Sequence, residues 1–103
     1  MDSKTPEQIC LDAAELISTY GHMKNTIGNY DVGFCALGAI MQAFDQTRSA
    51  WSNVCTPEVG QAWGLLSKTL GFSTDVDIPK WNNADERTAE DVILALKRAG
   101  HGE

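Results

Sequence analysis

Residues 32–41 read VGFCALGAIM, a run without a charge or a strongly hydrogen-bonding side chain. The run is too short to cross a bilayer, which takes roughly 20 apolar residues. An apolar run this continuous is typical of a buried element that other elements surround. Its small residues, among them Gly38 and Ala39, allow neighbouring backbones to approach closely. We therefore predict a central helix over about residues 35–47 in a small all-α domain.

Capping residues and apolar spacing predict three further helices. Thr5 can accept a hydrogen bond from a free amide, Pro6 suits the first helical position, and Gln8 would complete a capping box. Thr88 begins the last helix in the same way. The three helices are expected over about residues 6–20, 57–70 and 89–99, each ended by a glycine, namely Gly21, Gly71 and Gly100.

Two long loops are expected between these helices. Residues 22–33 are rich in turn residues, and residues 72–85 are polar, with Pro79 preventing a continuous helix. The fold class predicted is therefore an all-α bundle of about four helices around the central apolar helix. The chain of 103 residues is predicted to be a single helical domain, with residues 1–4 and 101–103 frayed.

The charge balance limits the classes of partner. Eight Lys and Arg residues stand against 14 Asp and Glu residues, giving a formal net charge of −6. A nucleic-acid binder needs a basic face, so neither nucleic acid nor a membrane is expected as a partner. The acids between Asp75 and Asp91 can imitate phosphates toward a DNA-binding partner, or simply form a solvated face.

Cysteine usage predicts a cytoplasmic protein. The chain has three cysteines, an odd number, and no signal peptide is expected ahead of the first helix. A metal site built from Cys10, His22, Cys35 and Cys55 is an alternative to three ordinary thiols. The chain has no CxxC or HxxxH spacing, so no metal and no cofactor are expected.

Two patterns in the chain carry a family resemblance. The first is a Gly-x-Cys-Ala-x-Gly-Ala helix formed by Gly33, Cys35, Ala36, Gly38 and Ala39; the second consists of Trp81, Asn82, Arg87, Thr88 and Val92. Over about residues 10–99 the chain resembles an uncharacterised family of small bacterial and bacteriophage proteins, a domain of unknown function. The resemblance implies a bacterial or phage accessory protein and no activity. The chain departs from the family at Asn83, where an Asp is usual.

The best candidate for a surface site lies in the second long loop. Trp81, Asn82, Asn83 and Arg87 can stack on and hydrogen-bond a planar or anionic ligand, or anchor a protein partner. Tyr30 and Asp31 in the first long loop complete the predicted ligand- or partner-binding set. The structural alternative is that Trp81 fills the core, Asn82 satisfies loop amides, and Arg87 pairs with nearby acids or carbonyls.

Cys35 offers a catalytic alternative. A thiol at a helix N-terminus has its thiolate stabilised by the helix dipole, with His22 as base and Asp31 or an Asn orienting it. The flanking apolar residues favour a small core thiol instead, and a buried apolar thiol is inert. We therefore expect no catalytic residues and no enzyme.

These observations favour a small non-catalytic binding module that acts by protein–protein contact on a host or bacterial protein. The alternative is a module that binds or sequesters a small nucleotide-like ligand between the two long loops. A Cys35/His22 hydrolase is the third hypothesis, and a homodimer remains open.

Overall fold

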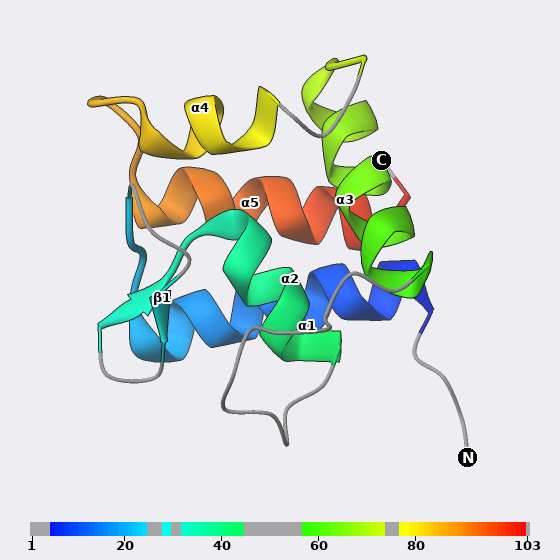
Figure 1. Cartoon of the computed structure of the whole chain (residues 1–103), viewed down its shortest axis with the longest axis horizontal. Helices are drawn as coiled ribbons and strands as arrows, with labels where there is room; N and C mark the ends of the chain where they lie inside the picture. Colours follow the sequence, from blue (N-terminus) through cyan, green and yellow to red (C-terminus); the bar gives the residue numbers. More distant parts are fainter. Residues whose placement is uncertain (1–4, 25–27, 30–31, 45–56, 74–76, 103) are drawn as a thin grey trace.

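Five helices and one short β-ladder make up the regular structure of residues 5–24, 28–29, 32–44, 57–73 and 77–102, which the computed structural model describes. The helices are α1 (Pro6–Tyr20), α2 (Ala36–Phe44), α3 (Pro57–Leu70), α4 (Ile78–Asn83) and α5 (Ala89–Gly100) (Figure 1). Strands β1 (Gly28–Asn29) and β2 (Gly33–Phe34) pair antiparallel and are too short to form a layer. The prediction of an all-α fold is therefore confirmed.

The predicted helix caps form at both ends of the chain. The Thr5 hydroxyl accepts a hydrogen bond from the Gln8 backbone N–H at 3.1 Å. Thr88 and Asp91 form a complete capping box, because each side chain accepts from the other residue's backbone N–H at 3.1 Å. The capping box predicted at the start of α1 does not form, because the Gln8 side chain donates instead to Asp12 at 2.9 Å.

Helix α4 corrects the expectation of irregular chain over residues 72–85. Pro79 lies in the first turn of α4, where its missing N–H needs no partner and its fixed φ already suits a helix. The residue expected to prevent a helix therefore helps to begin one. The first long loop also contains more structure than expected, because β1 and β2 lie within or beside it.

Gly100 does not end its helix in the predicted way. It is the last residue of α5, and the positive φ of 77° occurs at Gly102 instead. A Cβ atom at Gly100 would lie 2.5 Å from Leu11 Cγ and 2.9 Å from the Glu7 carbonyl oxygen. Gly100 thus lets the end of α5 approach the start of α1 closely.

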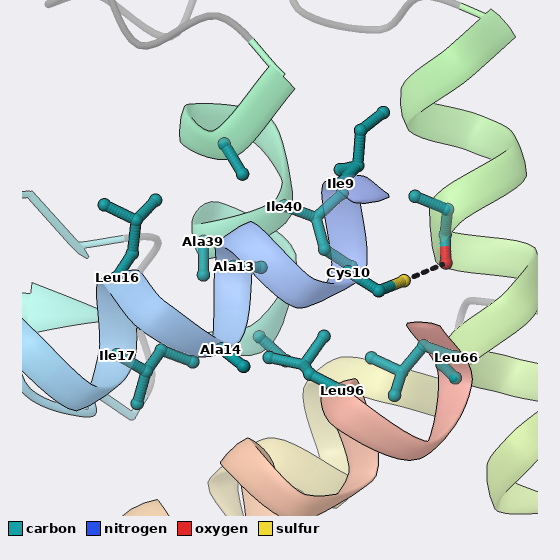
Figure 2. Close-up of a cluster of buried hydrophobic side chains, with 14 of the residues drawn as sticks. Ile9, Cys10, Ala13, Ala14, Leu16, Ile17, Ala39, Ile40, Leu66 and Leu96 are labelled. Atoms are coloured by element: carbon teal, nitrogen blue, oxygen red, sulfur yellow. Dashed lines mark hydrogen bonds between the residues drawn. The ribbon is translucent and has the colours of Figure 1, made fainter. Parts of the chain in front are cut away.

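Helix α1 joins the parts of the core, because it packs against α2, α3 and α5. Figure 1 shows α1 and α5 running alongside one another, with α3 at one end. Small residues, including Ala13 of α1 and Ala39 of α2, lie between neighbouring backbones, while Ile40, Leu66 and Leu96 fill the wider spaces (Figure 2). All five of these side chains are buried.

The predicted buried helix is present as α2. Every residue of α2 except Leu37 and Phe44 is buried, and these two are partly buried against the core. The expected end of this helix at about residue 47 lies outside the described residues. Among the described residues, no helix combines the length and apolar character that crossing a membrane requires.

Candidate functional site

The Asn82 side chain ties α4 to the start of α2 and to the chain after α1. Its Oδ1 atom accepts a hydrogen bond from the Ala36 backbone N–H at 3.0 Å and lies 2.8 Å from His22 Nε2. Its Nδ2 atom donates to the Met23 carbonyl and to Asn83 Oδ1, each at 3.0 Å. These partners fix the orientation of the amide, so His22 Nε2 must carry a proton and donate to Oδ1.

Lys24 reinforces this connection. Its ammonium group donates to the Ala84 carbonyl oxygen at 2.6 Å and to the Asp85 carbonyl oxygen at 3.1 Å. These two carbonyls belong to the C-cap residue of α4 and to the residue after it, so the ammonium group lies where the end of the helix carries partial negative charge. Two parts of the chain separated by 60 residues are therefore joined by a cation and by a buried amide.

Trp81 is held in place by Arg87. The Arg87 Nε–H donates to the Trp81 carbonyl oxygen at 2.9 Å, and the guanidinium carbon lies 4.5 Å from the centroid of the Trp81 ring. The guanidinium also approaches Asp91, with 3.8 Å between Nη1 and Oδ2. Arg87 thus covers one face of a half-buried indole and restricts its rotamers.

A surface pocket of about 400 Å³ lies beside the indole. Its lining consists of Phe72, Asp77, Lys80 and Trp81, which we call the Trp81 surface. Phe72 and Trp81 are partly buried against the core, whereas Asp77 and Lys80 are exposed. The pocket therefore combines two aromatic walls with one charge of each sign.

The structure places the predicted site residues in two different environments. Trp81 lines the pocket, and Arg87 contacts the Trp81 ring without being one of the lining residues. Asn82 is only 1% exposed and bonds internal partners, one of which is Asn83. Asn82 thus bonds backbone groups, and Arg87 bonds a backbone carbonyl and approaches an acid, as the structural alternative described. Tyr30 and Asp31 lie outside the described residues.

Sequence reasoning missed the contribution of Phe72, Asp77 and Lys80 to the pocket. The sequence places these residues in a segment predicted to be irregular, in which no common face is expected. The available signal was Pro79 after Asp77 and Ile78, because proline favours the first turn of a helix. Placing a helix there brings Asp77, Lys80 and Trp81 onto neighbouring turns.

Cys35 acts as the cap of α2. Its Sγ atom accepts a hydrogen bond from the Gly38 backbone N–H at 3.2 Å, and the residue is 8% exposed. Burial raises the pKa of the Cys35 thiol, and this outweighs the backbone N–H groups, which lower it. A raised pKa leaves little of the reactive thiolate at neutral pH. His22, its suggested base, has Nε2 bound to Asn82.

Cys10 is a second buried thiol. Its Sγ atom donates to the Ala62 carbonyl oxygen across 3.6 Å (Figure 2). Burial, with a smaller contribution from the charge of Glu7, raises the pKa of Cys10 to about 12. Within the described part of the chain, no group of His, Cys, Asp and Glu side chains is arranged to hold a metal ion, and Cys55 falls outside it.

Comparison with models of protein families places the chain in a family. Residues 1–101 match the model of a protein family described as "Family of unknown function (DUF6197)". The match covers nearly the whole chain and confirms the expected resemblance to an uncharacterised family. No curated protein and no solved structure matches this chain.

Proposed function

This chain belongs to the DUF6197 family, whose function is unknown, and from that premise we propose that it is a non-catalytic module that binds a partner protein through the Trp81 surface. The observation that carries the proposal is a half-buried tryptophan, fixed by Arg87, beside a pocket of about 400 Å³. Tryptophan is enriched among the residues that dominate binding energies at protein interfaces. The resemblance to bacterial and phage proteins supports a cytoplasmic host or bacterial protein as the partner.

Restriction of the Trp81 ring supports a binding role. Ordering a mobile side chain on binding costs roughly 0.5–1.5 kcal/mol. The contact with Arg87 already restricts the indole in the unbound protein. Most of the entropy cost of ordering this side chain is therefore met during folding and does not weaken binding. Lys80 and Asp77 at the pocket add charges that can select a partner by complementarity.

The raised thiol pKa values support a non-catalytic role. Cys35 and Cys10 are both buried, and burial raises the pKa of each thiol. Both sulfur atoms are also engaged with backbone groups of the protein itself. Such thiols serve packing and capping better than nucleophilic attack.

Affinity capture with matched variants tests the proposal. Immobilised wild-type protein is exposed to bacterial lysate beside Trp81→Ala, Lys80→Glu and Leu94→Ala, and the captured proteins are identified by mass spectrometry. Leu94 is the control, because it is a large apolar residue that is 58% exposed on α5 and does not line the pocket. The expected partner binds the wild type and Leu94→Ala, and its affinity falls at least about tenfold with Trp81→Ala.

Lys80→Glu keeps the experiment decisive if Trp81→Ala is poorly folded. Lys80 is exposed, so its replacement leaves the core intact while changing the charge at the pocket. Repeated failure to capture any partner contradicts the proposal. Capture that is equally strong with Trp81→Ala and Lys80→Glu contradicts the assigned surface.

A second candidate function is binding of a nucleotide-like ligand at the same pocket. Its volume, about 400 Å³, lies within the range of roughly 300–1,000 Å³ that is usual for small-molecule sites. An indole and a phenyl ring offer stacking surfaces, and Lys80 offers a cation for a phosphate. Nucleoside phosphates should then raise the melting temperature of the wild type and leave that of Trp81→Ala unchanged.

A further inference from the structure

A second, more polar pocket lies where α5 ends against α3. Its volume is about 310 Å³. Its lining consists of Leu65, Lys68, Thr69, Arg98, Ala99 and Gly102, which we call the α3–α5 pocket. Figure 1 shows the C-terminal end of the chain beside α3, in agreement with the packing of these two helices.

The charge of this pocket is opposite to that of the chain. The protein carries a formal net charge of −6, yet the two ionisable residues of the pocket are Lys68 and Arg98. Both side chains are exposed, and neither makes a hydrogen bond or ion pair within the described part of the chain. None of the described residues that line the pocket carries a carboxylate, and Glu103, which follows Gly102 in the chain, lies outside the described residues.

Helix dipoles account for part of this charge but not for all of it. Lys68 and Arg98 lie in the last turns of α3 and α5, where each helix end carries roughly −0.5 of an elementary charge. Among the described groups at the pocket, two full positive charges against about one negative charge leave a net positive charge. Glu7 shares an adjoining pocket with Lys68, but it lies in the first turn of α1, whose positive end balances it.

We propose that the α3–α5 pocket binds a side-chain carboxylate from an acidic segment of a partner protein. The Arg98 guanidinium can bind a carboxylate through two parallel hydrogen bonds, and Lys68 adds a second charge. Leu65, which is only partly buried, offers apolar contact to the methylene groups of Asp or Glu. The pocket shares no residue with the Trp81 surface, so the inference stands independently of the proposed function.

The overall negative charge makes this pocket selective. An acidic segment is repelled by most of a surface with net charge −6. It therefore gains affinity only where cations are concentrated and unpaired. A neutral segment gains nothing from Lys68 and Arg98, so carboxylates should be necessary for binding.

Neighbouring cations on α5 provide a matched test. Lys97 and Arg98 are both exposed in the last turn of α5, but only Arg98 lines the pocket. Fluorescence anisotropy of the full chain at low salt would measure binding of a short, end-capped peptide of alternating Glu and Gly. A peptide with Gln in place of Glu is the uncharged control.

The expected result distinguishes a pocket from general attraction. Wild-type protein binds the Glu peptide but not the Gln peptide. Arg98→Ala and Lys68→Ala each weaken binding by about tenfold, as expected for loss of a hydrogen bond between charged groups, and Lys97→Ala weakens it by less than about twofold. All three side chains are exposed, so the variants should fold, which their melting temperatures verify.

Three results would overturn the inference. The first is failure of the wild type to bind the Glu peptide. The second is equal weakening by Lys97→Ala and Arg98→Ala, which would indicate general attraction to a cationic helix end. The third is binding of inorganic phosphate more tightly than the peptide, which would assign the pocket to a free oxyanion.

Discussion

Replacement of Asn82 by Ala should destabilise the protein more than any exposed substitution on α4. The change removes the acceptor of the buried Ala36 N–H and the donor to the Met23 carbonyl. Leaving a buried polar group without a partner costs about 1–3 kcal/mol. Because His22, Met23 and Asn83 are only partly buried and can reach water, we count one such loss, at the buried Ala36 N–H, of about 1–3 kcal/mol.

Chemical and thermal unfolding can measure this loss. The free energy of unfolding follows from urea titration monitored by circular dichroism, with Lys80→Ala as the control on the same helix. At about 4 °C per kcal/mol for a domain of this size, the melting temperature of Asn82→Ala should fall by about 4–12 °C. Lys80 is exposed and Ala is an equally good helix former, so its replacement should change stability by less than about 0.5 kcal/mol.

Asn82→Asp separates the two halves of the amide. A carboxylate keeps the acceptor for Ala36 but loses the donor to Met23 and places a charge beside that carbonyl. Burial should raise the pKa of this new carboxyl group, so the variant should gain stability as the pH falls and the group becomes neutral. A loss below about 1 kcal/mol in Asn82→Ala would refute the assignment of Asn82 as the main connection between α4 and α2.

Four further predictions concern glycines and thiols. Gly33→Ala should cost at least about 2 kcal/mol by urea unfolding, because φ is 104° and the new Cβ would lie 2.6 Å from the Gly21 carbonyl group. Gly64→Ala should instead stabilise α3 by about 0.5–1 kcal/mol, since no atom lies within 4 Å of the new Cβ; a loss would contradict this open environment. Because burial raises the folded-state pKa of Cys10 from 9.0 to about 12, its contribution to stability is fully present below pH 9. Above pH 9 the free energy of unfolding should fall by about 1.4 kcal/mol per pH unit until about pH 12. Cys10→Ala should show a flatter alkaline profile. Cys35 should react with iodoacetamide in the native protein no faster than Cys10, and rapid labelling at neutral pH would restore the catalytic hypothesis.

The polar residues of the protein fall into two groups, those that hold the fold together and those that line the two pockets. Asn82 and Lys24 have internal partners and fix the position of α4. The Trp81 surface and the α3–α5 pocket present side chains that can still make contacts outside the chain. The roles of Asn82 and Lys24 are therefore tested by stability measurements, whereas the roles of the two pockets are tested by binding measurements.

The sequence alone determined the features that depend on neighbours three or four residues away. Thr5 and Thr88 cap their helices through the backbone N–H three residues ahead, so the cap can be recognised without knowing the fold. The apolar run containing Ile40 predicted a buried helix because moving apolar side chains out of water is favourable. Family membership likewise followed from short patterns along the chain.

Only the tertiary structure decided how distant residues are used. Asn82 bonds groups that lie 46 to 60 residues away, and no periodicity in the sequence selects such partners. Gly100 was expected to end a helix, but its missing side chain is required by contact with Leu11 of α1. Lys68 and Arg98 each have a local reason to lie near a helix end, yet the packing of α3 on α5 brings them to one pocket. Local hydrogen bonding and burial of apolar surface can be predicted from sequence, whereas contacts between separate helices depend on how their faces pack.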